Sequence, residues 1–511
     1  MKQKLVIMLL TACMALSCTC GFTACNGNGD TPHEHTYVHG VCTECGELEP
    51  QPTDGLIFTL SVDEMEYAVT GYTGTETEVT ITPTYKGLTV TSIESNAFQN
   101  SEHVTSITIP DSVISIGKNA FNGTAYYNDE RNWDNDALYI GNHLIKARET
   151  LSGTYTIRNG TKVIAASVFQ ACENLAGITI PGGVTHIGNW AFSGCSNLTS
   201  ITIPDSVISI GVGVLDDTAY YNDESNWEND VLYLSNHLIE ARSTLSGAYA
   251  IRNSTRTIAD NAFQFCQSIT DITIPDSITR IGDFVFQNCR SLSSITIPDS
   301  VVSLGVQAFE YCSSLTSITI PGSVTSIRGW AFAWCTSLTT ISIPDSVTSI
   351  AYGAFTSCFN LTSITIPNSV TIIGRAAFSG CISIESITVA SGNPVYHSVD
   401  NCLIETASKT LVLGCKNSVI PTDGSVISIG DEAFYWCKSL TSVTIPESVT
   451  SIGRGAFTDC DNLTSVTFEN TEGWSVEGWD GQINNIDVTD PAQNVVYLTY
   501  TYCLNVWTRG E

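Results

Sequence analysis

Five potential metal ligands lie close together near the N-terminus of the chain: His33, His35, His39, Cys42 and Cys45. Imidazole and thiolate groups are the ligands that tetrahedral Zn²⁺ prefers, and a Cys-x-x-Cys turn presents two sulfurs to one ion. The spacing predicts a structural zinc knuckle rather than a catalytic centre, because protein side chains can fill all four coordination positions. A linker without fixed structure, or a local disulfide between Cys42 and Cys45, would explain the same residues.

The rest of the sequence offers no catalytic motif. It contains no Gly-x-Ser-x-Gly, no His-Glu-x-x-His and no phosphate-binding loop. Its 21 Lys+Arg against 51 Asp+Glu give a net charge of −30, which excludes the cationic groove that nucleic acid requires. We therefore expect no enzymatic activity, no required cofactor beyond the possible structural zinc, and no nucleic-acid partner.

The first 24 residues have the layout of an export signal. Lys2 and Lys4 precede a short apolar run, and small residues follow up to Cys25. Cys25 behind Thr23 and Ala24 resembles the lipobox of bacterial lipoproteins, which implies a lipoprotein signal peptide at 1–24 and lipid attachment at Cys25. Ordinary signal cleavage, or lipid attachment at Cys18, remains open. Residues 25–50 are then a tether, and we expect the lipid to be the only contact with the membrane.

A repeat of 23 residues dominates the chain. Prolines recur at this spacing, and so do phenylalanines, at 263, 286, 309, 332, 355 and 378. Between Leu292 and Pro298 apolar and hydroxyl residues alternate, a period of two that predicts a strand with Ile295 and Ile297 pointing inward. One such unit cannot bury its own apolar edge, so neighbouring units must stack as coils.

The repeat resembles the BspA-like (treponemal-type) leucine-rich repeat, whose units read like Cys-x-x-Leu-x-x-Ile-x-Ile-Pro followed by Ala-Phe-x-x-Cys. The resemblance covers about residues 91–468. It implies an α/β, β-dominated, right-handed solenoid with parallel strands on the concave face, about 23 residues per coil and β-hairpin insertions. Members of this family are surface proteins of bacteria and protists, and some are adhesins.

Three insertions interrupt the repeat, near 122–160, 216–254 and 390–420. The first two are copies of one another, because residues 111–181 recur at 205–275. Their shared aromatic residues could form a ligand-binding platform, or could instead hold each loop against the solenoid. The candidate ligand-binding residues are Tyr126, Tyr127, Trp133, Tyr220, Tyr221 and Trp227.

The two ends and the cysteines complete the organisation. We expect an N-terminal β cap at 51–90 and a C-terminal cap at 469–511, because an open solenoid end exposes apolar surface. Ten cysteines share one position in the coil, which favours small buried thiols over disulfides, although neighbouring coils are close enough for pairing. They are Cys172, Cys195, Cys266, Cys289, Cys312, Cys335, Cys358, Cys381, Cys437 and Cys460.

Glycine follows the second strand in most coils, as at Gly188 and Gly374, but Arg328 and Ala351 stand there in two. This indicates a turn that prefers glycine without requiring it. On the expected concave face, exposed Ser and Thr columns offer many weak hydrogen bonds.

The sequence therefore predicts a monomeric, lipid-anchored cell-surface binding protein, an adhesin or interaction scaffold, with extracellular proteins or glycans as partners. A glycan-capture lipoprotein in nutrient uptake, or a purely structural envelope protein, is the alternative.

Overall fold

The computed structural model describes residues 51–478 and 482–510, together with the strands β1 (Tyr37–Val38) and β2 (Val41–Cys42), which pair antiparallel. The chain divides into two compact units, of which unit 1 contains residues 1–59 and 67–132 and unit 2 contains residues 60–66 and 133–511. In both units short strands alternate with tight turns, and helix is confined to a few turns.

Unit 1 already contains the parallel pairing of the repeat. β7 pairs parallel with β4 on one side and with β9 on the other, and β5 pairs parallel with β8. Parallel pairing therefore begins inside residues 51–90. The elements of unit 1 are β3 (Leu56–Leu60), β4 (Tyr67–Tyr72), β5 (Glu78–Thr80), β6 (Thr84–Tyr85), β7 (Leu88–Ile93), β8 (Ser106–Thr108), β9 (Ser115–Ile116), α1 (Ala125–Asn128) and η1 (Glu130–Asn132).

Unit 2 is a row of coils, each with two short strands. The first strand of a coil carries the Ser-Ile-Thr pattern and pairs in register with the same strand of the next coil, for example Ile295 with Ile272. These strands are β13 (Gly153–Thr156), β15 (Leu175–Thr179), β17 (Ser200–Thr202), β22 (Ser246–Ala250), β24 (Ser268–Thr273), β26 (Ser294–Thr296), β28 (Ser317–Thr319), β30 (Thr340–Ser342), β32 (Ser363–Ile366), β34 (Ser386–Val389), β39 (Ser442–Ile445) and β41 (Ser465–Phe468).

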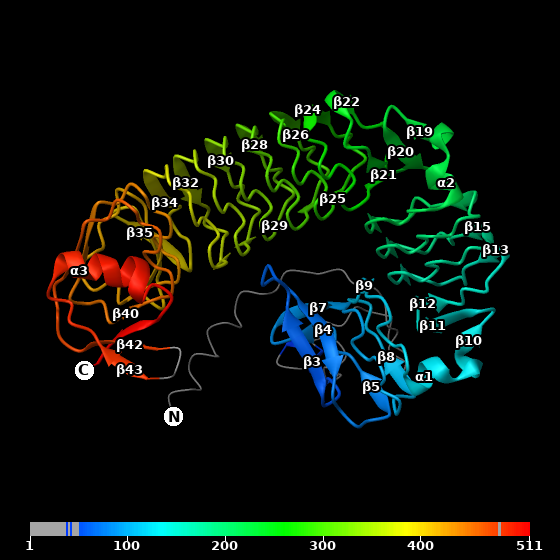
Figure 1. The fold of residues 1–511 in the computed structure, drawn as a ribbon, viewed down its shortest axis with the longest axis horizontal. Coiled ribbons are helices and arrows are strands. Elements are labelled where there is room, and N and C mark those ends of the chain that lie inside the picture. The colour runs from blue at the N-terminus through cyan, green and yellow to red at the C-terminus, as the bar shows by residue number, and fades with distance from the viewer. Residues whose placement is uncertain (1–36, 39–40, 43–50, 479–481, 511) are drawn as a thin grey trace. The chain divides into compact units, whose positions relative to one another are not determined.

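The second strand of each coil has only two residues and forms a second parallel sheet. These strands are β14 (Val163–Ile164), β16 (His186–Ile187), β18 (Ser209–Ile210), β23 (Thr257–Ile258), β25 (Arg280–Ile281), β27 (Ser303–Leu304), β29 (Ser326–Ile327), β31 (Ser349–Ile350), β33 (Ile372–Ile373), β38 (Ser428–Ile429) and β40 (Ser451–Ile452). Figure 1 shows β25 and β29 along the inner side of this row of coils, and β22 to β34 along its outer side.

Between the two sheets of unit 2 the core repeats from coil to coil. Phe309 and Phe332 stack with ring centroids 5.4 Å apart and an interplanar angle of 3°, and the next pair, Phe332 and Phe355, repeats this at 5.4 Å and 7°. All three rings are fully buried. The predicted inward isoleucines and the 23-residue stacking are confirmed, and the chain folds as the β-dominated solenoid that the repeat predicts.

The insertions fold as antiparallel hairpins that join the short-strand sheet. In the second one, β20 pairs antiparallel with β21, and β21 pairs parallel with β23. The insertion elements are β10 (Trp133–Asp134), β11 (Ala137–Ile140), β12 (His143–Ala147), α2 (Ala219–Asn222), η2 (Glu224–Asn226), β19 (Trp227–Glu228), β20 (Val231–Leu234), β21 (His237–Ala241), β35 (Tyr396–Val399), β36 (Cys402–Glu405) and β37 (Thr410–Leu413).

After the last coil the chain turns back on itself. β44 (Trp507–Arg509) pairs antiparallel with β40 and with β42 (Trp474–Glu477), which also pairs with β43 (Ile483–Asn485). The helix α3 (Pro491–Val496) and the π-helical turn η3 (Tyr497–Thr501) lie between these strands in the sequence. Trp474 and Trp507 are buried against Phe468, so aromatic side chains close this end of the apolar core.

Candidate binding surfaces

The loop of the second insertion is held by hydrogen bonds from its own residues. The buried Thr218 side chain caps α2 by accepting from the Tyr221 backbone N–H at 3.0 Å. Trp227 Nε1 donates to the Tyr221 carbonyl at 2.8 Å, and Tyr220 OH donates to the Tyr233 carbonyl at 2.9 Å. Each polar atom at the edge of these rings therefore bonds to the insertion itself.

The faces of the insertion aromatics are covered by arginines. The Arg242 guanidinium lies 4.1 Å from the centre of the Trp227 ring, and both of its terminal nitrogens donate to Glu224, at 2.9 and 2.8 Å. In the same way, Arg252 lies 3.9 Å from the centre of the Tyr233 ring. A cation over an aromatic face is itself a stabilising contact, so these rings serve the fold of the loop.

The first insertion repeats this arrangement. In unit 1, Thr124 accepts from the Tyr127 backbone N–H at 3.1 Å, and Asn132 donates to the Tyr126 carbonyl at 2.9 Å. In unit 2, the Arg148 guanidinium lies 4.4 Å from the centre of the Trp133 ring. Identical contacts in two copies support the structural interpretation of the shared aromatics. Ligand binding at Tyr126, Tyr127, Trp133, Tyr220, Tyr221 and Trp227 stays a prediction.

The predicted sites near the N-terminus fall outside the part of the chain that the structure describes. This applies to Cys25, His33, His35, His39 and Cys45. Cys42 ends the strand β2. Among the described residues, no cluster of His, Cys, Asp and Glu could hold a metal ion, and no helix is long and apolar enough to span a membrane.

The Ser and Thr columns lie on the outer sheet of unit 2. Residues such as Ser294, Thr296, Ser317 and Thr319 are exposed, while the isoleucines between them are buried or nearly so. The expectation that these columns face the concave side is wrong, because they belong to β26 and β28 on the outer side in Figure 1. Both strands of a coil have one exposed face, so alternation alone does not decide which strand is the inner one.

The cysteines that share one coil position are free, and most bond to the coil before them. Cys312 Sγ donates to the Phe286 carbonyl at 3.2 Å, and Cys335 Sγ donates to the Phe309 carbonyl at 3.2 Å. Burial raises the pKa of the Cys335 thiol to about 12. The thiols therefore stay protonated and unreactive at neutral pH, and they link neighbouring coils by S–H···O contacts.

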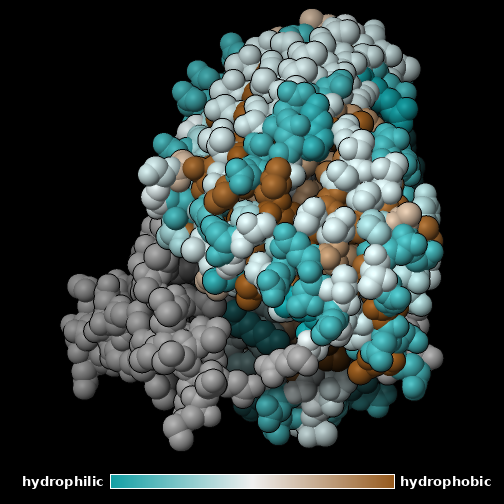
Figure 2. All heavy atoms as spheres, turned by 90° about the vertical axis from the view of Figure 1, so that its left-hand side faces the viewer, coloured by the Kyte–Doolittle hydropathy of each residue, from teal (hydrophilic) through white to brown (hydrophobic). Residues whose placement is uncertain are grey.

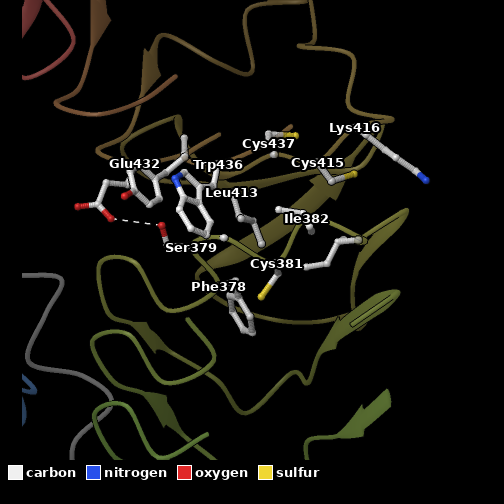
Figure 3. A pocket seen from close by; sticks show the side chains of 15 residues that line it. Phe378, Ser379, Cys381, Ile382, Leu413, Cys415, Lys416, Glu432, Trp436 and Cys437 are labelled. Carbon is white, nitrogen blue, oxygen red and sulfur yellow. Dashed lines mark hydrogen bonds between the residues drawn. The ribbon is translucent and has the colours of Figure 1, made fainter. Parts of the chain in front are cut away.

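A small crevice marks the place where the third insertion rejoins the solenoid (Figure 3). Phe378 and Cys381 line one side of it, and Leu413, Cys437 and Trp436 line the other. Its volume of about 10 Å³ holds at most one water molecule. The crevice is therefore no pocket for an organic ligand, and recognition has to use the open surface.

Sequence reasoning missed a second group of aromatic side chains, which lies at the turns of unit 2. The rings of Tyr311 and Trp334 stack at 5.5 Å, and Phe359 contacts both Trp334, at 5.5 Å, and Trp436, at 5.8 Å. Tyr435 stacks beside Trp436 at 6.1 Å. We call these five residues the aromatic track. The 23-residue spacing of Tyr311 and Trp334 was the available signal.

The surface around these features is mixed in polarity. Figure 2 shows the end of unit 2 that carries its last strands, with hydrophobic side chains in small groups between hydrophilic ones. Large exposed hydrophobic residues at this end include Val496, Tyr500 and Leu504. Small scattered groups of this kind are ordinary on a protein surface, so they single out no binding site.

Stacked coils with two parallel strands each, joined by tight turns around an aliphatic and phenylalanine core, define a leucine-rich repeat solenoid. The family model of the BspA type leucine rich repeat region matches the chain in six copies, over residues 84–148, 139–246, 243–358, 303–424 and 413–473. The chain belongs to this family. Leucine-rich repeat proteins are generally non-enzymatic scaffolds, and the family suggests a binding or surface role.

Solved structures give three similar chains. A leucine rich cell surface protein from Faecalibacterium prausnitzii is 26% identical, with 67% of this chain and 95% of that chain covered and a TM-score of 0.27. A leucine-rich repeat protein from Bacteroides ovatus is 24% identical, with coverages of 82% and 99% and a TM-score of 0.29. One from Eubacterium ventriosum is 20% identical, with coverages of 84% and 97% and a TM-score of 0.28. No curated protein matches the chain.

Proposed function

We propose that the chain is a non-catalytic cell-surface binding protein, an adhesin or interaction scaffold that presents its solenoid to host or microbial proteins or glycans. The observation that supports this most is the outer sheet of unit 2. Its exposed positions are uncharged hydroxyl residues through several consecutive coils, from β26 to β32. Such a face gives an extended partner many equivalent hydrogen-bonding positions.

The chemistry of the described residues agrees with a binding role. The crevice at the third insertion holds at most one water molecule, and the buried thiols are held protonated by their surroundings. The aromatic rings of the insertions lie against arginines of the same loops. These features serve stability, which leaves the solenoid surface for partners.

The test is an array of glycans and extracellular-matrix proteins, probed with the purified chain. The matched variant carries Thr296→Lys and Thr319→Lys, which place two charges on the exposed outer sheet without touching the core. Val302→Lys, at a side chain that is 54% exposed outside the hydroxyl columns, is the control. We expect spots that the double variant loses and the control keeps. An array without any spot would move the assignment to the structural envelope role.

Export and anchoring belong to the same proposal. We expect the mature chain to begin at Cys25 with a lipid on the thiol and the amine, and Cys25→Ala to release the protein from the membrane fraction. Intact mass of the membrane-extracted protein measures this directly. The zinc proposal for His33, His35, His39, Cys42 and Cys45 is tested separately, by metal analysis of the purified chain and of a variant with both cysteines changed to serine.

Glycan capture in nutrient uptake is the second candidate, and it would use the insertion loops. Its specific prediction is that a soluble glycan binds the chain and that Trp227→Ala abolishes this binding while the loop stays folded. Because Trp227 also packs under Arg242, protection of the loop from protease must be measured in parallel. Loss of both would make Trp227 a structural residue.

A further inference from the structure

One turn of the coil has the same unusual backbone throughout the described solenoid. The residue three before the shared cysteine position or its equivalent is not the unusual one; the residue directly before it has a positive φ, between 58° and 73° in the coils of unit 2 from Phe265 onward. Asparagine, aspartate and glycine tolerate this left-handed conformation best, whereas other side chains pay about 1 kcal/mol for it. The residues at this position are Asn100, Gly123, Ala171, Gly194, Asp217, Phe265, Asn288, Tyr311, Trp334, Ser357, Gly380, Trp436 and Asp459.

Aromatic residues at this position are therefore not chosen by the backbone. Tyr311, with φ of 59°, Trp334, with φ of 59°, and Trp436, with φ of 58°, hold a conformation that is rare for bulky side chains. Asn288 and Asp459 fill the equivalent place in neighbouring coils. A conformational cost retained at several coils points to a function of the side chains themselves.

The aromatic track is continuous across the third insertion. Trp334 and Trp436 are far apart in the sequence, yet both contact Phe359, at ring-centre distances of 5.5 and 5.8 Å. All five side chains of the track are half-buried, so each leaves part of its ring at the surface. The insertion thus returns the chain at the place that brings the two halves of the track together.

Polar groups border these rings, and their charges balance. Trp436 Nε1 donates to Asp459 Oδ2 at 2.7 Å, while Lys438 Nζ lies 4.9 Å from the centre of the Trp436 ring and 3.1 Å from Asp461. Thr336, beside Trp334, adds a half-buried hydroxyl. Rings with a locally balanced, hydrogen-bonding border match a ligand that is uncharged and combines apolar faces with hydroxyl groups.

We propose that the aromatic track is a binding site for a neutral polysaccharide chain. The C–H face of a pyranose packs against an aromatic ring, and its hydroxyls reach the bordering polar groups. Tyr311, Trp334 and Trp436 supply successive ring contacts along the solenoid, and Asp459 and Lys438 supply hydrogen bonds at one end. This proposal rests on the proposed function, since it names a ligand class for a protein whose role is surface binding.

The left-handed backbone allows a variant that separates binding from folding. Tyr311→Asn and Trp334→Asn together remove two rings and place the tolerated residue at each position, as Asn288 shows one coil away. The matched control is Phe265→Asn, which makes the same change at a side chain that is 49% exposed and lies beyond Asn288, outside the track. The full chain is used in every case.

The probes are soluble neutral polysaccharides, namely dextran, mannan, a β-glucan and arabinoxylan, in affinity gel electrophoresis, with hyaluronate and the protein array as comparisons. We expect at least one neutral polysaccharide to retard the wild-type chain. We expect the double variant to lose at least tenfold in affinity, the Phe265→Asn control to keep it, and the urea midpoint of both variants to stay at the wild-type value.

Three results would overturn the proposal. The first is that no neutral polysaccharide retards the wild-type chain while array proteins or hyaluronate do, which leaves the surface-binding function standing. The second is an equal loss of affinity in the Phe265→Asn control. The third is a lowered urea midpoint in the double variant with unchanged affinity, which makes the track a structural contact. Silence from every macromolecule would instead remove the proposed function as well.

Discussion

The phenylalanine stack should carry a large share of the local stability of unit 2, and Phe332 is the position to test. Its ring is fully buried and stacks between Phe309 and Phe355, with centroid distances of 5.4 Å on both sides. The chain supplies its own comparison, because Leu215 fills the same place in another coil and is also buried. Phe332→Ala and Phe332→Leu therefore bracket the contribution of the ring.

The size of the two effects follows from what each variant removes. Truncating a buried phenylalanine to alanine costs about 4 kcal/mol, from lost transfer energy and the cavity left behind. Leucine keeps most of the apolar volume and loses mainly two aromatic pairs, each worth about 1 kcal/mol, so Phe332→Leu should cost about 2 kcal/mol. The leucine variant should thus keep about half of the stabilisation that the alanine variant loses.

Native-state hydrogen exchange is the suitable assay, because a repeat solenoid can unfold in parts and a single global transition is not assured. The informative amides are those that join consecutive coils, such as Phe309 N–H to the Ala331 carbonyl at 2.8 Å and Phe332 N–H to the Ala354 carbonyl at 2.8 Å. Where exchange reports opening equilibria, their protection should fall roughly a thousandfold in the alanine variant and about thirtyfold in the leucine variant.

The reasoning also predicts where the effect stops. Coils contact only their neighbours, so the amide of Phe192, near the start of unit 2, should keep its protection in both variants. Equal losses in the alanine and leucine variants would refute the role assigned to ring stacking. A loss of the same size at Phe192 would refute the nearest-neighbour picture of the solenoid.

Three further predictions concern single positions. Gly414→Ala should cost about 1–3 kcal/mol in urea unfolding, because its Cβ would lie 2.0 Å from a buried phenylalanine ring, whereas Gly322→Ala, with no atom within 4 Å, should be neutral. Burial lowers the pKa of His186 to about 4, so the unfolded chain takes up its proton first. Stability should then fall as the pH drops from about 6.5 to about 4, and His186→Gln should flatten this decline in a thermal melting series. Iodoacetamide mapped by mass spectrometry should label the half-buried Cys503 in the native chain and spare Cys312 until it unfolds; native labelling of Cys312 would contradict the buried thiol contacts.

The sequence determines the repeating part of the fold closely. The alternation around Ile295 predicts β26 and its buried face, and the spacing of Phe309, Phe332 and Phe355 predicts their stack. These features follow from local patterns that recur, so each coil confirms its neighbour. The sequence also shows that the insertions are hairpins, because their apolar runs, such as β20 and β21, are short and consecutive.

The glycine after the second strand shows where sequence reasoning stops. At Gly188 and Gly374 the backbone does not have a positive φ. A Cβ at Gly188 would instead lie 2.6 Å from the backbone nitrogen of Ala166 in the preceding coil, and one at Gly374 would lie 2.4 Å from that of Tyr352. Glycine is used here for close approach between coils, a distance that no single coil encodes.

The binding surfaces were less predictable for a related reason. Trp227 stands out in the sequence, but its position under Arg242 depends on how the hairpin folds back. The contact from Phe359 to Trp436 depends on how the third insertion rejoins the solenoid. Contacts that cross an irregular segment leave no periodic trace, so the aromatic track emerges only in three dimensions.

The constant offset between hydrogen-bonding partners has a consequence for how such a chain can change in length. The backbone N–H of Phe263 donates to the Val285 carbonyl, that of Phe286 to Ala308, and that of Phe309 to Ala331, with the same step each time. Deleting or duplicating one whole coil therefore restores every donor to an equivalent acceptor and every ring to an equivalent ring. The gene can lengthen or shorten this surface one coil at a time, so its reach is a quantity that selection can adjust without redesigning the fold.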